Sequence, residues 1–283
     1  MITFSNLGRH GRLGNAMFQY AAVKSLAHKL GCITKIPPNL SERSHHGQKC
    51  LLTNFNIECD AYDECELENL TARHENCEGG QYNPDFWNFK ENTNLIGHFE
   101  SELYFEPIKE QIIKEFHLNT ALDEYAENYI SNIKNNYKNC TIIALHFRRG
   151  DFKDIPQHQY FCDQEWNSLY ISNATKEFDD ITNKIFLVFT GGSTSENNNN
   201  NDDMEWCKSF VKGDNILYCT ENDTIRDFSI MTKCDHLITN TMSSMAWWSG
   251  YLNENPNKKI VVPNLEYKSR ETYWPKNFIK VSI

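Results

Sequence analysis

The second half of the chain alternates short apolar runs with stretches of helical period. Residues 140–147 read CTIIALHF, a continuous apolar run typical of a strand that is covered on both faces. Further strands are predicted at 184–190, 215–220, 236–239 and 258–263, and helices at 164–178, 204–211, 224–234 and 243–252. Strands that alternate with helices favour an α/β fold with a doubly wound parallel sheet.

The first half of the chain has a less regular pattern. Residues 2–7 predict a short strand, Gly8, Gly11 and Gly14 follow it, and a helix is expected from Asn15 to about residue 30. Little can be assigned over 35–95, and a helical period resumes near Tyr104. A length of 283 residues suits two domains of ordinary size, which we place at 1–139 and 140–283.

Composition and charge narrow the possible partners. Hydrophobic residues make up 40% of the chain and aromatic residues 13%, as in globular proteins. The net charge is −10 and no basic block stands out, so we expect no nucleic-acid partner, and an anionic ligand must be held by a local cluster of donors. Ten cysteines without a C-x-x-C pair, no signal sequence and no apolar window of about 18 residues predict a cytoplasmic protein without a membrane span.

Polar segments follow the predicted strands of the second half. In doubly wound sheets, ligands bind beyond the carboxyl ends of the strands. One of these ends carries His146, Arg148, Arg149 and Asp151. Arginine keeps its charge, and its planar guanidinium matches phosphate oxygens, so the pair indicates a diphosphate site. The alternative is structural, with one arginine paired to Asp151 and the other facing water.

Two other segments are candidates for contact with a nucleotide. The turn GRHGRLGN at 8–15 lets backbone approach a ligand, although it fits neither a nicotinamide fingerprint nor a P-loop, and a plain tight turn explains it equally well. Ser243 and Ser244 predict a helix cap, either one whose N-terminus meets a phosphate or base or an ordinary serine cap, while Trp247 and Trp248 suit a core.

Metal chemistry is not expected from this sequence. There is no D-x-D triplet, and Asp202 and Asp203 are expected to lie in the Asn-rich loop after the second strand rather than in a fixed carboxylate pair. We therefore expect no metal cofactor, with arginines in the neutralising role.

Several motifs together resemble the α-1,2-fucosyltransferases of glycosyltransferase family 11. They are GRLGNAMFQYA (11–21), HFRRGDF (146–152), MEWCK (204–208), RDFSIMTKC (226–234) and SSMAWWSGYL (243–252). The resemblance implies a GT-B fold, with two Rossmann-like domains facing across a cleft. It also implies inverting transfer of fucose, without a metal, from GDP-fucose on the C-terminal domain to a galactose-ended acceptor glycan nearer the N-terminal domain.

The resemblance also implies roles for individual residues. The residues implied to bind the donor are Gly14, Asn15, His146, Arg148, Arg149, Ser243 and Ser244. Our own mechanistic hypothesis makes Arg148 the main donor to the leaving diphosphate, with Asp151 as a candidate base whose competing role is to orient Arg149. The alternatives are a fucosyltransferase with a different linkage or acceptor, and a non-catalytic protein that binds a nucleotide sugar or a glycan.

Overall fold

The computed structural model describes residues 1–283 except 78–80, 192–199, 222 and 265–270. The chain forms two compact units. The first comprises Met1–Asn119 with Glu266–Lys276, and the second Thr120–Leu265 with Asn277–Ile283. The second unit therefore begins with helix α3 (Thr120–Asn136), ahead of the boundary at 139/140 that we expected from the sequence.

The second unit is built on a six-stranded, all-parallel sheet in the order β10-β9-β8-β11-β12-β13. Its strands are β8 (Thr141–Arg148), β9 (Lys184–Gly191), β10 (Ile216–Tyr218), β11 (His236–Thr239), β12 (Ile260–Pro263) and β13 (Ile279–Val281). The first five confirm the predicted strands, and β13 was not predicted. The chain runs outward from β8 to β10 and returns to β11 on the other side of β8, so the strand order reverses between β8 and β11.

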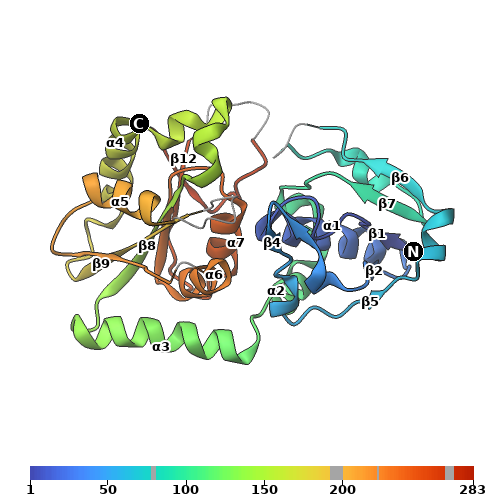
Figure 1. The fold of residues 1–283 in the computed structure, drawn as a ribbon, viewed down its shortest axis with the longest axis horizontal. Helices are drawn as coiled ribbons and strands as arrows, with labels where there is room; N and C mark the ends of the chain where they lie inside the picture. Colours follow the sequence, from blue (N-terminus) through green and yellow to red (C-terminus); the bar gives the residue numbers. More distant parts are fainter. Residues whose placement is uncertain (78–80, 192–199, 222, 265–270) are drawn as a thin grey trace. The chain divides into compact units, whose positions relative to one another are not determined.

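Helices cover both faces of this sheet (Figure 1). They are α3, α4 (Gln164–Ala174), α5 (Asn200–Phe210), α6 (Thr224–Lys233) and α7 (Ser244–Leu252), with 3-10 turns η7 (Gly150–Asp154), η8 (Pro156–Cys162) and η9 (Thr175–Phe178). Residues of α4, η9 and α5 pack against Ile143, Leu145 and Phe147, which are alternate positions of β8 and therefore share one face.

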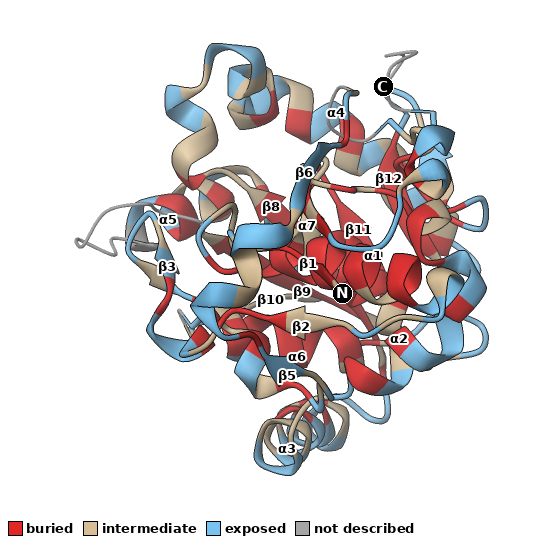
Figure 2. Ribbon diagram, turned by 90° about the vertical axis from the view of Figure 1, so that its right-hand side faces the viewer, coloured by how far each residue is buried: buried red, intermediate tan, exposed pale blue. Residues whose placement is uncertain are grey.

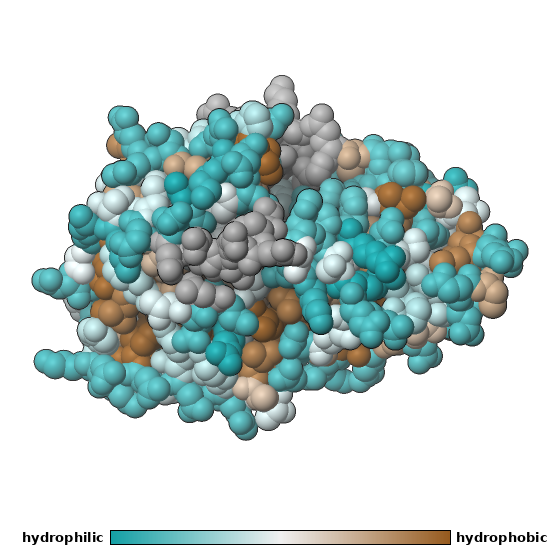
Figure 3. Space-filling model, in the orientation of Figure 1, coloured by the Kyte–Doolittle hydropathy of each residue, from teal (hydrophilic) through white to brown (hydrophobic). Residues whose placement is uncertain are grey.

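Helix α3 shows how the sequence produces a half-exposed helix. Its buried residues Ala126, Ile130 and Ile133 are spaced by four and three positions and form one narrow stripe, which packs near α6. The remaining residues of the helix are half-buried or exposed, and most of them are polar, as the hydrophilic surface along the lower left of Figure 3 shows.

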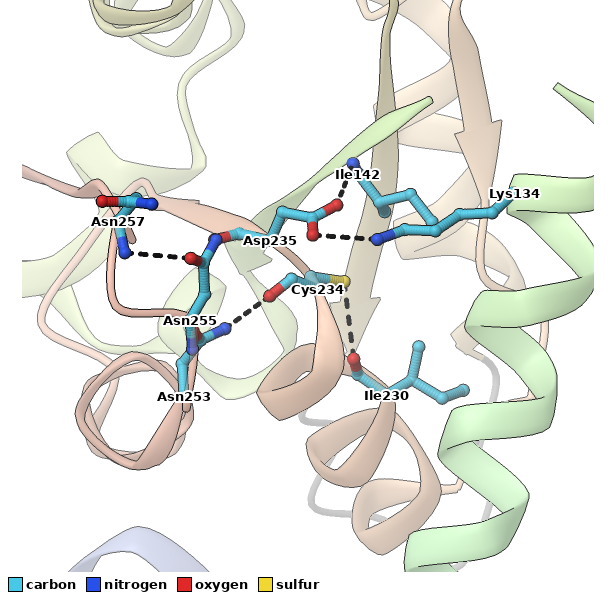
Figure 4. A network of polar contacts seen from close by, with 8 residues as sticks. All are labelled: Lys134, Ile142, Ile230, Cys234, Asp235, Asn253, Asn255 and Asn257. Atoms are coloured by element: carbon cyan, nitrogen blue, oxygen red, sulfur yellow. Dashed lines mark hydrogen bonds and ion pairs between the residues drawn. The ribbon is translucent and has the colours of Figure 1, made fainter. Parts of the chain in front are cut away.

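A polar network fixes the amino ends of β8 and β11 (Figure 4). One carboxylate oxygen of Asp235 accepts the backbone N–H of Ile142 at 2.7 Å, and the other accepts Lys134 Nζ at 2.9 Å. Asn255 donates to the backbone oxygen of Asp235 at 2.9 Å, and Asn253 donates to that of Cys234. These bonds leave the opposite, carboxyl edge of the sheet as the place for a ligand.

The first unit contains shorter strands around one long helix. The parallel sheet β1-β7-β6 comprises β1 (Ile2–Thr3), β7 (Thr93–Ile96) and β6 (Thr71–His74). Two further pairs are the parallel β2 (Lys35–Ile36) with β5 (Asp60–Ala61), and the antiparallel β3 (Ser44–His45) with β4 (Gln48–Lys49). The helices are α1 (Leu13–Leu30) and α2 (Lys109–Glu115), with 3-10 turns η1 (Leu40–Glu42), η2 (Leu52–Asn54), η3 (Glu64–Asn69), η4 (Pro84–Asn88), η5 (Glu102–Tyr104) and η6 (Glu106–Ile108).

The expected unit of strand, glycine turn and helix is present as β1, residues 4–12 and α1. Helix α1 is mostly buried, whereas every residue of β6 is exposed (Figure 2). The helix begins at Leu13 rather than Asn15, so Gly14 lies in its first turn. It ends at Gly31, whose φ of 64° and N–H bond back to the last turn make a left-handed cap that glycine adopts without strain.

Candidate active site

The residues singled out in the second unit gather where the strand order of its sheet reverses. His146 of β8 is paired in register with Thr239 of β11, and Arg148 ends β8. Because open α/β sheets bind ligands at the carboxyl ends beside such a reversal, this is the expected position of a nucleotide.

Asn240, which follows β11, connects the end of β8 with η8 and α4. Its Oδ1 accepts the backbone N–H of Arg148 at 2.9 Å, and its Nδ2 donates to Asn167 Oδ1 at 2.9 Å and to the oxygen of Phe161 at 3.1 Å. Asn240 is fully buried, so these bonds fix the backbone at Arg148 against β11 and α4. Sequence reasoning did not single out Asn240, although it lies in a polar segment that follows a predicted strand.

His146 is a buried, neutral imidazole. Burial, and secondarily the charge of Arg148, lower the pKa of His146 to about 3. Its Nδ1 lies 3.4 Å from Thr239 Oγ1, and that hydroxyl donates its single proton to the oxygen of Thr241 at 3.2 Å. The Thr239 hydroxyl therefore accepts from Nδ1–H, which leaves the lone pair of His146 on Nε2.

Arg148 lies at the mouth of the site, with 18% of its side chain exposed. Its Nη2 donates to Asp151 Oδ1, and its guanidinium stands over the ring of Phe152, 5.1 Å from the centroid. Asp151 thus pairs with Arg148 and not with Arg149, the partner that the sequence suggested. A guanidinium held on one side by a carboxylate and stacked on a ring has a restricted orientation.

Arg149 points into the body of the second unit. Its Nη1 donates to Asp203 Oδ1, and its guanidinium stacks on Trp206 at 4.9 Å. Asp203 also accepts the N–H of Gly150 at 3.0 Å and pairs with Lys153 at 3.3 Å. The expectation that Asp203 lies in a loop is wrong, because it sits in the first turn of α5 and is buried against these donors. The Asn-rich run before it lies partly outside the described residues.

Ser243 and Ser244 begin helix α7 as predicted. Ser243 is the N-cap, and its Oγ accepts the N–H of Ala246 at 3.4 Å. Ser244 is the first helical residue. Trp247 and Trp248 are fully buried, which confirms their predicted place in the core. The helix N-terminus that follows β11 offers backbone N–H groups at the carboxyl edge of the sheet.

Gly14 and Asn15 belong to the first unit. Gly11 has a φ of +94°, and a Cβ there would lie 2.5 Å from Asn15 Cβ, so only glycine lets the turn pass this close to α1. The side chain of Asn15 contacts the ring of His98, with 3.3 Å between Nδ2 and Nδ1. His98 was not predicted, and no local pattern in the sequence marks it.

The described part of the chain holds no group of three or more His, Cys, Asp or Glu side chains arranged to bind a metal ion. None of its helices combines the length and the apolar character needed to cross a membrane. All ten cysteines are free thiols.

Solved structures share the fold of this chain. POFUT1 in complex with GDP-fucose matches with a TM-score of 0.51 and 13% identity over 92% of this chain and 97% of that structure. Fucosyltransferase NodZ from Bradyrhizobium matches with a TM-score of 0.50 and 11% identity over 89% of this chain and 91% of that structure. The fold is therefore α/β of the GT-B type, as expected.

Curated proteins match at the level of sequence. Galactoside alpha-(1,2)-fucosyltransferase 2 of Bos taurus is 24% identical over 261 residues, or 86% of this chain and 67% of the relative. Galactoside alpha-(1,2)-fucosyltransferase 1 of Leontopithecus chrysomelas is 25% identical over 259 residues, or 86% of this chain and 63% of the relative. The family model "Glycosyl transferase family 11" matches residues 3–281. The chain therefore belongs to glycosyl transferase family 11 and is a glycosyltransferase.

Proposed function

We propose that this enzyme transfers fucose from GDP-fucose to the 2-hydroxyl of a galactose-type acceptor, with inversion and without a metal. The names of the matched relatives support the sugar and the linkage, and the neighbour solved with GDP-fucose supports the donor. The observation that carries the proposal is the partly exposed guanidinium of Arg148 at the reversal between β8 and β11. The ten cysteines of the chain are free thiols, which suit a reducing compartment, and we propose that the enzyme acts in the cytosol.

Arg148 is the group that we assign to the leaving diphosphate. As the bond from fucose C1 breaks, its electron pair passes to the β-phosphate oxygen, and negative charge builds there. A donor that is oriented beforehand stabilises this charge, and removing one in comparable sites costs about 3 to 4 kcal/mol. The ring of Phe152 and the carboxylate of Asp151 provide that orientation.

Asp151 acts in this proposal by positioning Arg148. Its ion pair with Nη2 holds the guanidinium at the site before the donor binds, and a phosphate oxygen then competes with the carboxylate for the same planar set of donors. Because its Oδ1 is already engaged by Arg148, we assign Asp151 the positioning role rather than that of the group that deprotonates the acceptor.

The remaining residues of the second unit suit the rest of the nucleotide. The lone pair on His146 Nε2 accepts a hydrogen bond from a hydroxyl such as those of ribose, and burial keeps this ring neutral. The amino end of α7, where Ser243 and Ser244 lie, favours an anion beside it through the helix dipole. Arg149 contributes indirectly, because its pair with Asp203 shapes the turn that follows Arg148.

A direct assay tests the proposal. The purified chain is incubated with GDP-fucose and lactose in the presence of EDTA, and GDP release and the linkage of the product are measured. We expect GDP and an α-1,2-linked trisaccharide in equal amounts. A matched acceptor that lacks the 2-hydroxyl of its galactose should give no product. Transfer to another hydroxyl, dependence on a divalent cation, or no GDP release would each contradict the proposal.

A further inference from the structure

In the second unit, His158 packs on the ring over which Arg148 lies. Phe152 belongs to η7 and His158 to η8, and both residues are half-buried. Their rings are stacked, with centroids 4.4 Å apart and planes 20° from parallel. The guanidinium of Arg148 lies over the same Phe152 ring, 5.1 Å from its centroid. The orientation of Phe152, and through it that of Arg148, therefore depends on the imidazole of His158.

The turn η8, which carries His158, is fixed to the same buried side chain as the backbone of Arg148. Asn240 accepts the backbone N–H of Arg148 through Oδ1, and it donates to the backbone oxygen of Phe161 through Nδ2. The same oxygen of Phe161 accepts from Nδ2 of Asn167, a fully buried residue of α4, at 2.8 Å. The backbone of Arg148 and the turn that supports its side chain are thus held by one set of buried amides.

Contacts within η8 restrict the imidazole itself. The ring of Phe161, which is 1% exposed, lies 6.4 Å from that of His158 and 6.5 Å from that of Phe152, measured between centroids. These distances lie in the range in which aromatic side chains stabilise one another. The backbone N–H of His158 donates to the oxygen of Ile155 at 2.8 Å, which closes the first turn of η8. The ring of His158 is therefore oriented before a ligand binds.

We propose that His158 is a positioning residue for Arg148, and that it acts through the ring of Phe152. This inference rests on the proposed function. Transfer requires the guanidinium to lie where charge builds on the leaving diphosphate, and a donor that is oriented beforehand needs no reorganisation during the step. Asp151 restricts Nη2 of Arg148, and the ring of Phe152 restricts the guanidinium plane. His158 contributes a flat ring that keeps Phe152 in this position.

The kinetic test compares His158→Ala with His158→Phe and Gln157→Ala in the lactose assay. Gln157 is the exposed neighbour of His158 in η8, so its variant is the matched control. We expect His158→Ala to lower kcat about tenfold, with KM for lactose within about twofold of wild type. His158→Phe keeps a flat ring and should bring kcat back to within about twofold of wild type. Gln157→Ala should keep the wild-type rate.

A double-mutant cycle with Phe152→Leu separates positioning from a merely structural role. Residues that act through one contact are not additive. In the Phe152→Leu background, His158→Ala should therefore lower kcat by less than about a further twofold. A full tenfold fall in that background would overturn the inference. Wild-type kcat in His158→Ala, or a His158→Phe variant as slow as His158→Ala, would overturn it too.

A measurement without an acceptor distinguishes failure of this inference from failure of the proposed function. Relaxation of the Arg148 side-chain N–H, measured by NMR on the full chain, reports the mobility of the guanidinium. The mobility should rise in His158→Ala and stay at the wild-type level in His158→Phe and Gln157→Ala. Unchanged mobility in His158→Ala would overturn the inference even if wild type transfers fucose. If the mobility rises but wild type makes no fucosylated product, the proposed function fails while the support of Arg148 by His158 stands.

Discussion

The carboxyl edges of the β1-β7-β6 sheet and of the six-stranded sheet are held by similar contacts but carry different charges. Each edge has one buried carboxylate that accepts backbone N–H groups of the functional turn. Asp203 accepts from Gly150 beside Arg149 and Lys153, whereas Glu75 accepts from His98 and Phe99 beside neutral rings. The edge of the second unit is thus organised around fixed cations, and the edge of the first unit around the stacked rings of His10 and His98, whose pKa values are lowered by burial.

The difference is in how permanent the charge is. A leaving diphosphate needs permanent positive charge, which arginine supplies at any relevant pH. An imidazole is charged only below its pKa, and burial lowers the pKa of both His10 and His98. Removing a charge should therefore be costly at the edge of the second unit and mild at the edge of the first.

Asp203→Asn should produce the largest change in stability. The substitution leaves Arg149 without its anionic partner while keeping the size of the side chain, and breaking a buried ion pair in this way costs about 3 to 5 kcal/mol. Urea unfolding measures the loss. Glu205→Gln is the control on the same helix, since Glu205 is 69% exposed, and it should stay within about 0.5 kcal/mol of wild type. Equal effects would mean that Asp203 does not organise this edge.

Because of His146, the free energy of unfolding should fall as the pH is lowered. Its pKa in the folded protein is lowered to about 3, so the unfolded chain binds the proton first as the pH falls below 6.5. The contribution of the neutral His146 to the free energy of unfolding is complete above pH 6.5 and falls by about 2 kcal/mol between pH 7 and pH 5. Unfolding curves of wild type and His146→Gln at pH 7 and pH 5 separate the contribution of His146 from those of other groups. Parallel losses in the two proteins would show that His146 is not buried as a neutral ring.

Glu75→Gln should be the mildest of the three changes. No cation is left unpaired, and the amide oxygen can still accept the N–H groups of His98 and Phe99, so the expected loss is about 1 kcal/mol. Because the charge of Glu75 raises the pKa of His98, the variant should lower that pKa further. NMR titration of the His98 ring measures this pKa, and an unchanged value would show that Glu75 does not act electrostatically on His98.

The sequence predicted the second unit far better than the first, for physical reasons. Strands β8 and β9 are buried on both faces and read as continuous apolar runs. Strand β6 is exposed throughout and therefore has no distinctive pattern, whereas β1 was predicted but is only two residues long. Helix α3 has a stripe of only three buried residues, which is a weak signal in the sequence.

The residues of the candidate site also divide into those that a local sequence pattern identifies and those that it does not. Arg148 and His146 were identifiable because they end an apolar run, and a local pattern is enough to show that. Asp203 and His98 owe their positions to contacts with residues far away in the chain, Arg149 and Asn15. Pairings of this kind are set by strand order and helix packing, and a single sequence does not display them.

The most direct test of the central claim compares Arg148→Lys with Arg149→Lys. Lysine keeps the charge but not the planar set of donors. The account predicts that Arg148→Lys lowers kcat for fucose transfer about 100- to 1000-fold with little change in unfolding free energy. Arg149→Lys should instead act mainly on stability, through its contacts with Asp203 and Trp206. Wild-type kcat in Arg148→Lys would contradict the account.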